Sequence, residues 1–130
     1  MKRDKGDIID RFTIATLKAE RIGSPETKKE YYAFLKAMDA KDINDPLCEM
    51  LMMINSNIWK LEASLKGNKE ELVNKHYIMD IQNTPALRNI GITTILIRDW
   101  NNLRVKVKNY INIISGEGFQ DQKQDHLSED

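Results

Sequence analysis

Apolar residues recur at alternating steps of three and four along most of the chain, which predicts amphipathic helices. The first such stretch covers residues 7–22 and is closed by Gly23, a residue type common just beyond the last turn of a helix. Its apolar stripe consists of Ile8, Phe12, Ala15, Ala19 and Ile22. Ser24 followed by Pro25 predicts the N-cap and first turn of a second helix. The apolar face of that helix consists of Tyr31, Phe34, Leu35 and Met38.

Asp45 followed by Pro46 repeats this start signal and predicts a third helix that ends at Gly67. Its apolar positions are Leu47, Leu51, Ile54, Ile58, Leu61 and Leu65. Asn68 with Glu71 three residues later is similar to a capping box, so we expect a separate, shorter helix to begin there. That helix would present Leu72, Val73, His76, Tyr77 and Ile81.

Thr84 and Pro85 predict the start of the last helix. Its spaced apolar residues are Leu96, Trp100, Leu103, Val107, Tyr110 and Ile114. The run Ile90–Ile97 has strand propensity, but no partner strand is visible, so we expect it to form an all-round apolar part of this helix, bent at Gly91. Such a run is apolar on more faces than one small bundle needs to bury, which indicates that the chain forms a homo-oligomer. The predicted fold is all-α, a bundle of about five helices with a long C-terminal helix.

Composition fits one soluble domain, because the chain has 130 residues of which 41% are hydrophobic. We place the helical bundle at residues 1–115 and expect residues 116–130 to be a disordered acidic tail. The tail has five acidic residues and one lysine, so it carries −4 and the remaining chain +4. A mildly basic domain attracts anions, but the clustered Lys and Arg runs typical of nucleic-acid binders are missing, so we expect no nucleic-acid partner.

The sequence also bears on location. We find no apolar stretch of the length that a membrane span needs, and the charged N-terminus is not followed by the apolar segment of a secretory signal. Cys48 is the single cysteine and cannot form an internal disulfide. We therefore expect a cytoplasmic protein with no membrane partner.

Motifs for the common kinds of catalysis are missing. The chain lacks glycine-rich phosphate loops and paired cysteines, and the consecutive Glu70 and Glu71 point in different directions. His76 and Asp80 stand one helical turn apart, a spacing more typical of an ordinary polar pair than of a metal site. Cys48 lies at the buried start of a helix, which favours a structural role over pairing with His76 as a nucleophile. We predict no catalytic residues, no metal and no cofactor.

Polar residues at helical spacing lie beside the apolar stripes of three helices. They are Asp10, Arg11 and Lys18 in the first helix, Asn55, Trp59 and Glu62 in the third, and Asn101, Arg104 and Lys108 in the last. Arginine grips phosphate or carboxylate bidentately, asparagine hydrogen-bonds polar edges, and a tryptophan face stacks on a planar ring. Together these side chains predict a site for a nucleotide-like anion.

The same residue types also suit a purely structural role. In that alternative they form salt bridges between helices and on the surface, such as Asp7 with Arg11 or Glu62 with Lys66. The two tryptophans, Trp59 and Trp100, would then be ordinary core residues.

Three segments carry a family resemblance. Residues 6–14 are Gly-Asp-Ile-Ile-Asp-Arg-Phe-Thr-Ile and are followed by Leu17-Lys18 and Arg21-Ile22. Residues 55–62 are Asn-x-x-Ile-Trp-Lys-Leu-Glu, and residues 101–112 are Asn-Asn-x-Arg-x-x-Val-Lys-x-x-Ile-Asn. In this order they resemble a small all-helical family found in bacteria and phages, whose segments are Gly-Glu-Leu-Ile-Asp-Lys-Leu-Thr-Ile, Asn-x-x-Leu-Trp-x-x-Glu and Asn-Asp-x-Arg-x-x-Leu-Lys-x-x-Ile-Asn. Two positions depart from the pattern: Asn102 replaces an aspartate, and the arginine that the family carries shortly after its second segment is either replaced by Lys66 or missing.

The resemblance implies a helical fold and a shared role for the same polar residues, but it names no substrate, because the family has no assigned chemistry. We expect a non-enzymatic helical oligomer that binds a small anionic, nucleotide-derived ligand, such as a phage protein that sequesters a host signalling nucleotide. One alternative is a helical protein-interaction module, an adaptor or regulator in which the polar residues fix helix packing. A second is a small hydrolase or transferase with Asp10, Glu62 or Asp99 as general base.

Overall fold

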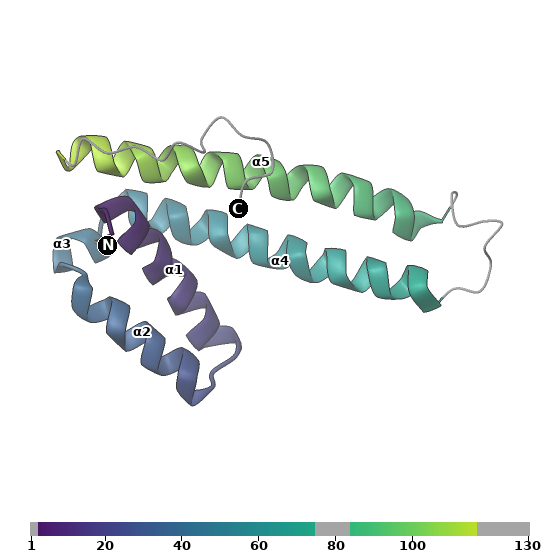
Figure 1. Cartoon of the computed structure of the whole chain (residues 1–130), viewed down its shortest axis with the longest axis horizontal. Coiled ribbons are helices and arrows are strands. Elements are labelled where there is room, and N and C mark those ends of the chain that lie inside the picture. Colours follow the sequence, from purple (N-terminus) through teal and green to yellow (C-terminus); the bar gives the residue numbers. More distant parts are fainter. Residues whose placement is uncertain (1–2, 75–83, 117–130) are drawn as a thin grey trace.

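The computed structural model describes residues 3–74 and 84–116, and these residues form helices joined by short turns (Figure 1). The helices are α1 (Lys5–Arg21), α2 (Pro25–Ala37), α3 (Ala40–Ile43), α4 (Pro46–Asn74) and α5 (Pro85–Ile114). The all-α prediction and the long C-terminal helix are therefore confirmed. None of the described helices is both long and apolar enough to cross a membrane.

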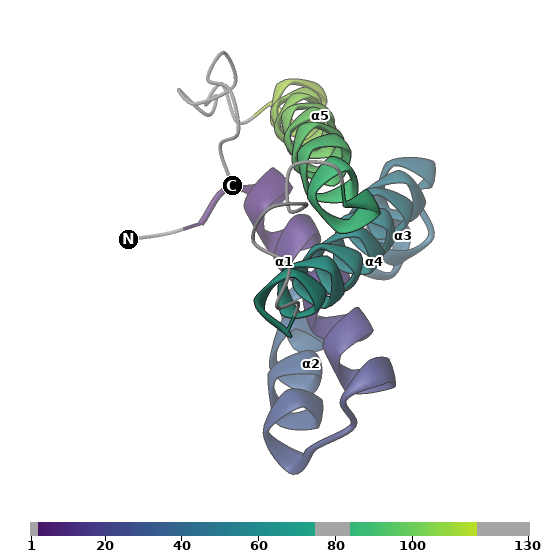
Figure 2. The same ribbon diagram turned by 90° about the vertical axis from the view of Figure 1, so that its right-hand side faces the viewer.

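The two longest helices, α4 and α5, lie side by side and run in opposite directions (Figure 1). Helices α1 and α2 form a hairpin that packs where α4 begins and α5 ends. Viewed end-on, α2 lies on the far side of α4 from α5 (Figure 2). Helix α1 contacts α2, α4 and α5, so it connects the hairpin to the long pair. Away from the hairpin, the described parts of α4 and α5 pack on each other alone (Figure 1).

The helix starts follow the capping signals in the sequence. The Ser24 and Thr84 side chains accept hydrogen bonds from the backbone N–H groups three residues later, and each is followed by proline. Asp45 accepts from the Leu47 N–H at 2.8 Å. Helix α1 begins two residues before the predicted start, because Asp4 caps it by accepting from the Asp7 N–H at 2.8 Å. Gly23 follows α1 with a φ of 69°, the left-handed conformation that the sequence predicts.

The prediction that a helix ends at Gly67 and another begins at Asn68 is wrong. Helix α4 continues to Asn74, and the Asn68 side chain donates to the Ser64 carbonyl at 2.9 Å instead of capping a new helix. A glycine inside a helix costs only about 1 kcal/mol, which good helix formers on both sides of Gly67 offset. Leu72 and Val73 therefore belong to α4. The remaining positions of the predicted short helix, His76, Tyr77 and Ile81, lie outside the described residues, as does most of the predicted tail.

The run Ile90–Ile97 is helical, as the missing partner strand predicts. Helix α5 passes through Gly91 without interruption. The run is not buried on all sides, because Ile92 and Ile95 are each 51% exposed while Thr93 is buried. The short helix α3 has no counterpart in the prediction, because its four residues are too few to show a period.

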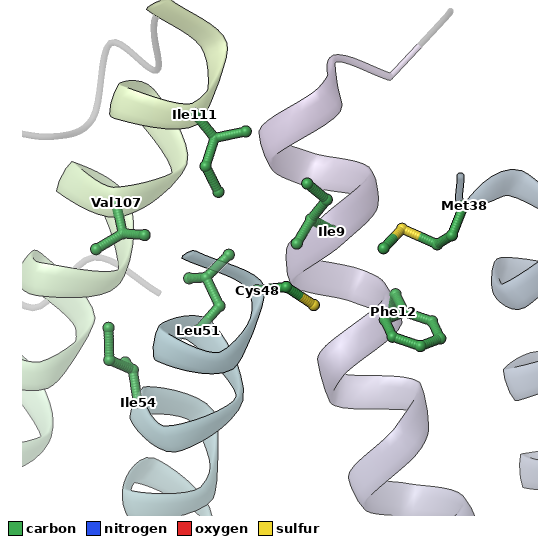
Figure 3. Packing of buried hydrophobic residues seen from close by; sticks show 8 residues of the cluster. All are labelled: Ile9, Phe12, Met38, Cys48, Leu51, Ile54, Val107 and Ile111. Carbon is green, nitrogen blue, oxygen red and sulfur yellow. The ribbon is translucent and has the colours of Figure 1, made fainter. Parts of the chain in front are cut away.

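The core lies where the hairpin meets the long pair (Figure 3). Its buried members come from α1, α4 and α5, with Met38 from the end of α2: Ile9, Phe12, Met38, Cys48, Leu51, Ile54, Val107 and Ile111. Leu51 and Ile54 have no exposed surface. Half-buried side chains close the cluster, among them Trp100 from α5 and Phe34 from α2. Burial of these side chains is the main force that joins the helices.

Helix α1 approaches α5 closely at its first turn. A Cβ atom on Gly6 would lie closer to the backbone oxygen of Lys108 than real Cβ contacts allow. The Gly6 N–H donates to the Asn112 side-chain oxygen at 2.7 Å, and both residues are buried. Gly6 is therefore required by the contact between two helices.

We expect Gly6→Ala to lower the free energy of unfolding by roughly 1–3 kcal/mol, because the added methyl group forces α1 away from α5. Gly67→Ala is the matched control: its Cβ meets nothing within 4 Å, and it should raise stability by roughly 0.5–1 kcal/mol. Urea unfolding of both variants checks the pair. Destabilisation by Gly67→Ala would contradict a continuous α4.

Candidate functional site

A fully buried carboxylate forms the centre of the polar residues predicted from the sequence. Asp10 on α1 has no exposed surface. Arg104 on α5 grips it bidentately: Nε lies 3.0 Å from Oδ1 and Nη2 lies 2.8 Å from Oδ2. The remaining Nη1 of Arg104 donates to the Asn101 side-chain oxygen at 3.3 Å. The guanidinium plane is therefore fixed on two sides.

We call Asp10 and the polar side chains bonded to it the network, and helix α4 completes it through Asn55. Its side-chain nitrogen donates to Asp10 Oδ1 at 2.9 Å and to Thr13 Oγ1 at 2.8 Å. The Thr13 hydroxyl in turn donates to the Asp10 backbone oxygen at 2.7 Å. Since both carboxylate oxygens accept hydrogen bonds and the side chain is only 1% exposed, Asp10 is not placed to act as a general base. Its role is to hold Arg104.

The network reaches the surface through a second carboxylate, Asp7. Lys108 lies between the two acids, with Nζ 3.5 Å from Asp7 Oδ1 and 4.0 Å from Asp10 Oδ2. Arg3 and Arg11 each donate to Asp7 Oδ2 at 3.0 Å, which confirms the predicted Asp7–Arg11 pair. Two acids thus face four cations, so the cluster carries excess positive charge.

The same contacts set the protonation of Asp7. Burial by itself would raise the pKa of this carboxyl, but hydrogen bonds from Arg3 and Arg11, together with the charges of Lys108 and Arg11, outweigh it and hold the pKa below 3.8. Asp7 is therefore ionised at neutral pH.

An open groove of about 700 Å³ borders this network between α1, α4 and α5. Its lining is Ile14, Leu17, Asn55, Ile58, Trp59, Glu62, Ala63, Lys66 and Arg104. Arg104 and Asn55 thus belong to both the network and the groove. Trp59 is half-buried, and the guanidinium carbon of Arg21 lies 5.4 Å from its ring centroid. Arg21 is held there by donating to the Ser56 hydroxyl at 2.6 Å.

The structure brings most of the predicted site residues together. Asp10, Asn55, Asn101, Arg104 and Lys108 form the network, Arg11 joins it through Asp7, and Trp59 and Glu62 line the adjacent groove. Lys18 does not take part, because its ammonium lies 3.6 Å from Glu30 on α2. The Glu62–Lys66 pair suggested by spacing is not among the ion pairs of the described residues; both side chains line the groove.

Four further residues were not among the predicted site residues. Gly6 and Asn112 make the close contact between α1 and α5, while Arg21 and Lys66 add positive charge around Trp59. The sequence carries a signal for all four. Gly6 is the first residue of the segment 6–14, and Asn112 is the last residue of the segment 101–112. Lys66 stands one turn after Glu62, and Arg21 stands one turn after Leu17, which lines the groove.

The positions of the side chains also bear on a cysteine nucleophile and on a metal site. Cys48 is buried in the core, and burial together with nearby Asp45, Asp42 and Glu49 raises its thiol pKa to about 11, so it is protonated and unreactive at neutral pH. In the parts of the chain that the structure describes, no three His, Cys, Asp or Glu residues gather as a metal site would require.

The chain matches no family model, no curated protein and no solved structure. The family resemblance therefore stays a prediction. The three sequence segments on which it rests supply Asp10, Asn55 and Arg104.

We expect Arg104→Ala to lower the free energy of unfolding by about 3–5 kcal/mol, because it leaves the Asp10 carboxylate buried without its cation. Arg88→Ala, at an exposed position of the same helix, should change stability by less than about 0.5 kcal/mol. The double variant Asp10→Leu with Arg104→Met should lose less than its two single variants together, since neither charge is left alone. Additive losses in denaturant unfolding would argue against the pair.

The pH dependence of stability should reflect the ionisation of Asp7. Its pKa is lower folded than unfolded, so its ion pairs stabilise the fold above the ordinary value of 3.8 and this contribution is lost as pH falls below it. The melting temperature of the wild type should therefore exceed that of Asp7→Asn at about pH 6, and the gap should shrink below about pH 4. A gap that stays constant down to about pH 3 would show that Asp7 is not ion-paired in solution.

Proposed function

We propose that the groove between α1, α4 and α5 binds a small anionic ligand with a planar ring, of the nucleotide class, without converting it. The observation that carries this proposal is the placement of Arg104. Its guanidinium is locked by Asp10 and Asn101, yet it lines the open groove together with Trp59.

Arg104 retains hydrogen-bonding capacity toward a ligand. Each Nη atom carries two N–H groups, and the bonds to Asp10 and Asn101 use one on each. Its side chain is 20% exposed. An arginine held rigidly in this way loses little conformational entropy when an anion arrives, which favours affinity.

Charge and shape of the groove agree with such a ligand. Among the lining residues, Lys66 balances the acid Glu62, and Arg104, whose charge is paired with Asp10, contributes N–H donors. Trp59 supplies a ring for stacking, and Arg21 beside it adds another positive charge. A volume of about 700 Å³ is within the range of pockets that hold small organic ligands. Apolar side chains such as Ile14 and Ile58 suit the faces of a base.

Binding without turnover suits these residues, because the carboxylate at the centre is buried and committed to Arg104. A protein that holds a nucleotide without converting it sequesters that nucleotide. This is the role that we propose for the chain, including the case in which it acts against a host signalling nucleotide.

The test separates ligand contact from folding. Arg104 is not the residue to substitute in a binding test, because its loss also leaves Asp10 buried without a partner and destabilises the fold. Lys66 and Trp59 line the groove but have no part in the network. Ribonucleoside mono-, di- and triphosphates are titrated against the full chain by calorimetry, with the uncharged nucleosides as controls. Binding of a nucleotide, but not of its nucleoside, is expected.

Trp59→Leu should weaken that binding about tenfold or more, because stacking is lost, and Lys66→Ala should weaken it several-fold. Lys60→Ala is the matched control, an exposed lysine of α4 outside the groove, and should bind as the wild type does. Circular dichroism should show unchanged helicity in all three variants. If no phosphate compound binds at millimolar concentration, or if Lys60→Ala and Lys66→Ala behave alike, the groove is not the site.

A further inference from the structure

A row of exposed residues follows the side of α5 that faces away from the core. Its members are spaced alternately by four and three: Ile92, Leu96, Asp99, Leu103, Lys106, Tyr110 and Ile113. We call it the outer stripe. Its apolar members are between 39% and 54% exposed. The network residues Asn101 and Lys108 lie about 140–160° around the helix from Leu103, so the outer stripe is on the opposite side from the polar network.

The spacing of the outer stripe is that of a helix that packs against another helix. A four-and-three repeat keeps side chains on one seam, and here the seam is about 30 Å long. Five of its seven members are large apolar or aromatic residues. Exposed large apolar side chains that gather along one helical seam, rather than lying scattered singly, are typical of sites of protein association.

The outer stripe is complementary to itself when reversed. Leu96 and Tyr110 are equally far from Leu103 in the sequence. The separations of Asp99 and Lys106 from Leu103 differ by one residue, and so do those of Ile92 and Ile113. A two-fold axis through Leu103 would thus set Asp99 of one chain opposite Lys106 of the other, twice, with apolar residues opposite apolar residues. A parallel pair would instead set Asp99 against Asp99 and Lys106 against Lys106, which is repulsive.

Both charged groups have the freedom that this arrangement needs. The Asp99 side chain is 61% exposed, and its contact with the neighbouring Arg98 is long, at 3.8 Å. Lys106 is exposed, and no ion pair of the described residues includes it.

We propose that a second copy of this chain docks on the outer stripe, antiparallel, with Leu103 at the two-fold axis and two Asp99–Lys106 ion pairs beside it. The groove at Arg104 stays open in this dimer, because it lies between α5 and the other helices.

Charge exchange tests the proposal on the full chain by sedimentation velocity. The wild type should sediment as a dimer. Asp99→Lys alone and Lys106→Asp alone should each weaken the dimer about tenfold or more, because each turns two attractive pairs into repulsive ones. The double variant, Asp99→Lys with Lys106→Asp, should restore it. Glu20→Lys, an exposed acid of α1, is the control and should leave the dimer intact.

Cysteine cross-linking tests the direction. Leu103→Cys should form an intermolecular disulfide under mild oxidation, because a residue on the two-fold axis meets its own copy. Ile92→Cys should not, since its counterpart is Ile113. Cys48 is buried and does not compete. A monomeric wild type, a dimer unaffected by the single charge changes, or cross-linking through position 92 and not 103 would each overturn the proposal. Dimer formation with rescue by the double exchange would support it.

Discussion

The arrangement of α1, α4 and α5 depends on one buried ion pair. Asp10 is an ionisable side chain with no contact to water, and its burial is tolerable only because Arg104 and Asn55 saturate both oxygens. These partners come from two other helices, 45 and 94 residues away in the chain. The apolar core attracts the helices to each other without direction, whereas the carboxylate accepts only one arrangement of donors.

The close contact at Gly6 follows from the same constraint. For Arg104 to reach Asp10, α5 must lie near the first two turns of α1, and the missing side chain at Gly6 permits this. Asn112 then accepts the Gly6 N–H, a donor that the first turn of any helix leaves without a partner inside the helix. Lys108 lies between the two contacts and compensates the second acid, Asp7. The polar residues thus specify how the helices align, and the apolar residues supply most of the stabilisation.

Local signals in the sequence were sufficient for most of the fold. Ser24, Asp45 and Thr84 cap helices where the sequence predicts, because capping depends on neighbours within three residues. The predicted helix end at Gly67 is wrong, because the helix-breaking tendency of one glycine is small and the surrounding helix formers outweigh it.

The site was predictable as a set of residues but not as a geometry. Periodicity puts Asp10 and Arg104 on inward faces, but only the packing of the helices shows that they form an ion pair. Lys18 shares a helix with Asp10 but faces α2, a difference that depends on the hairpin. The structural and the ligand-binding interpretations of these residues are compatible, because Arg104 lines the groove while it is paired with Asp10.

The extension of α4 and α5 beyond the hairpin implies an uneven distribution of rigidity along the molecule. At the hairpin end, three helices enclose apolar side chains and a saturated ion pair, while the far end is a two-helix arm with few buried residues, among them Ala86 and Thr93. Backbone hydrogen bonds in such an arm break without disturbing the distant core, so opening starts there and costs less free energy than global unfolding. Arg21, the last residue of α1, contacts Ser56 and Trp59 of α4, and the groove continues along α4 to Lys66. The groove therefore spans a boundary between a rigid and a compliant part of one helix.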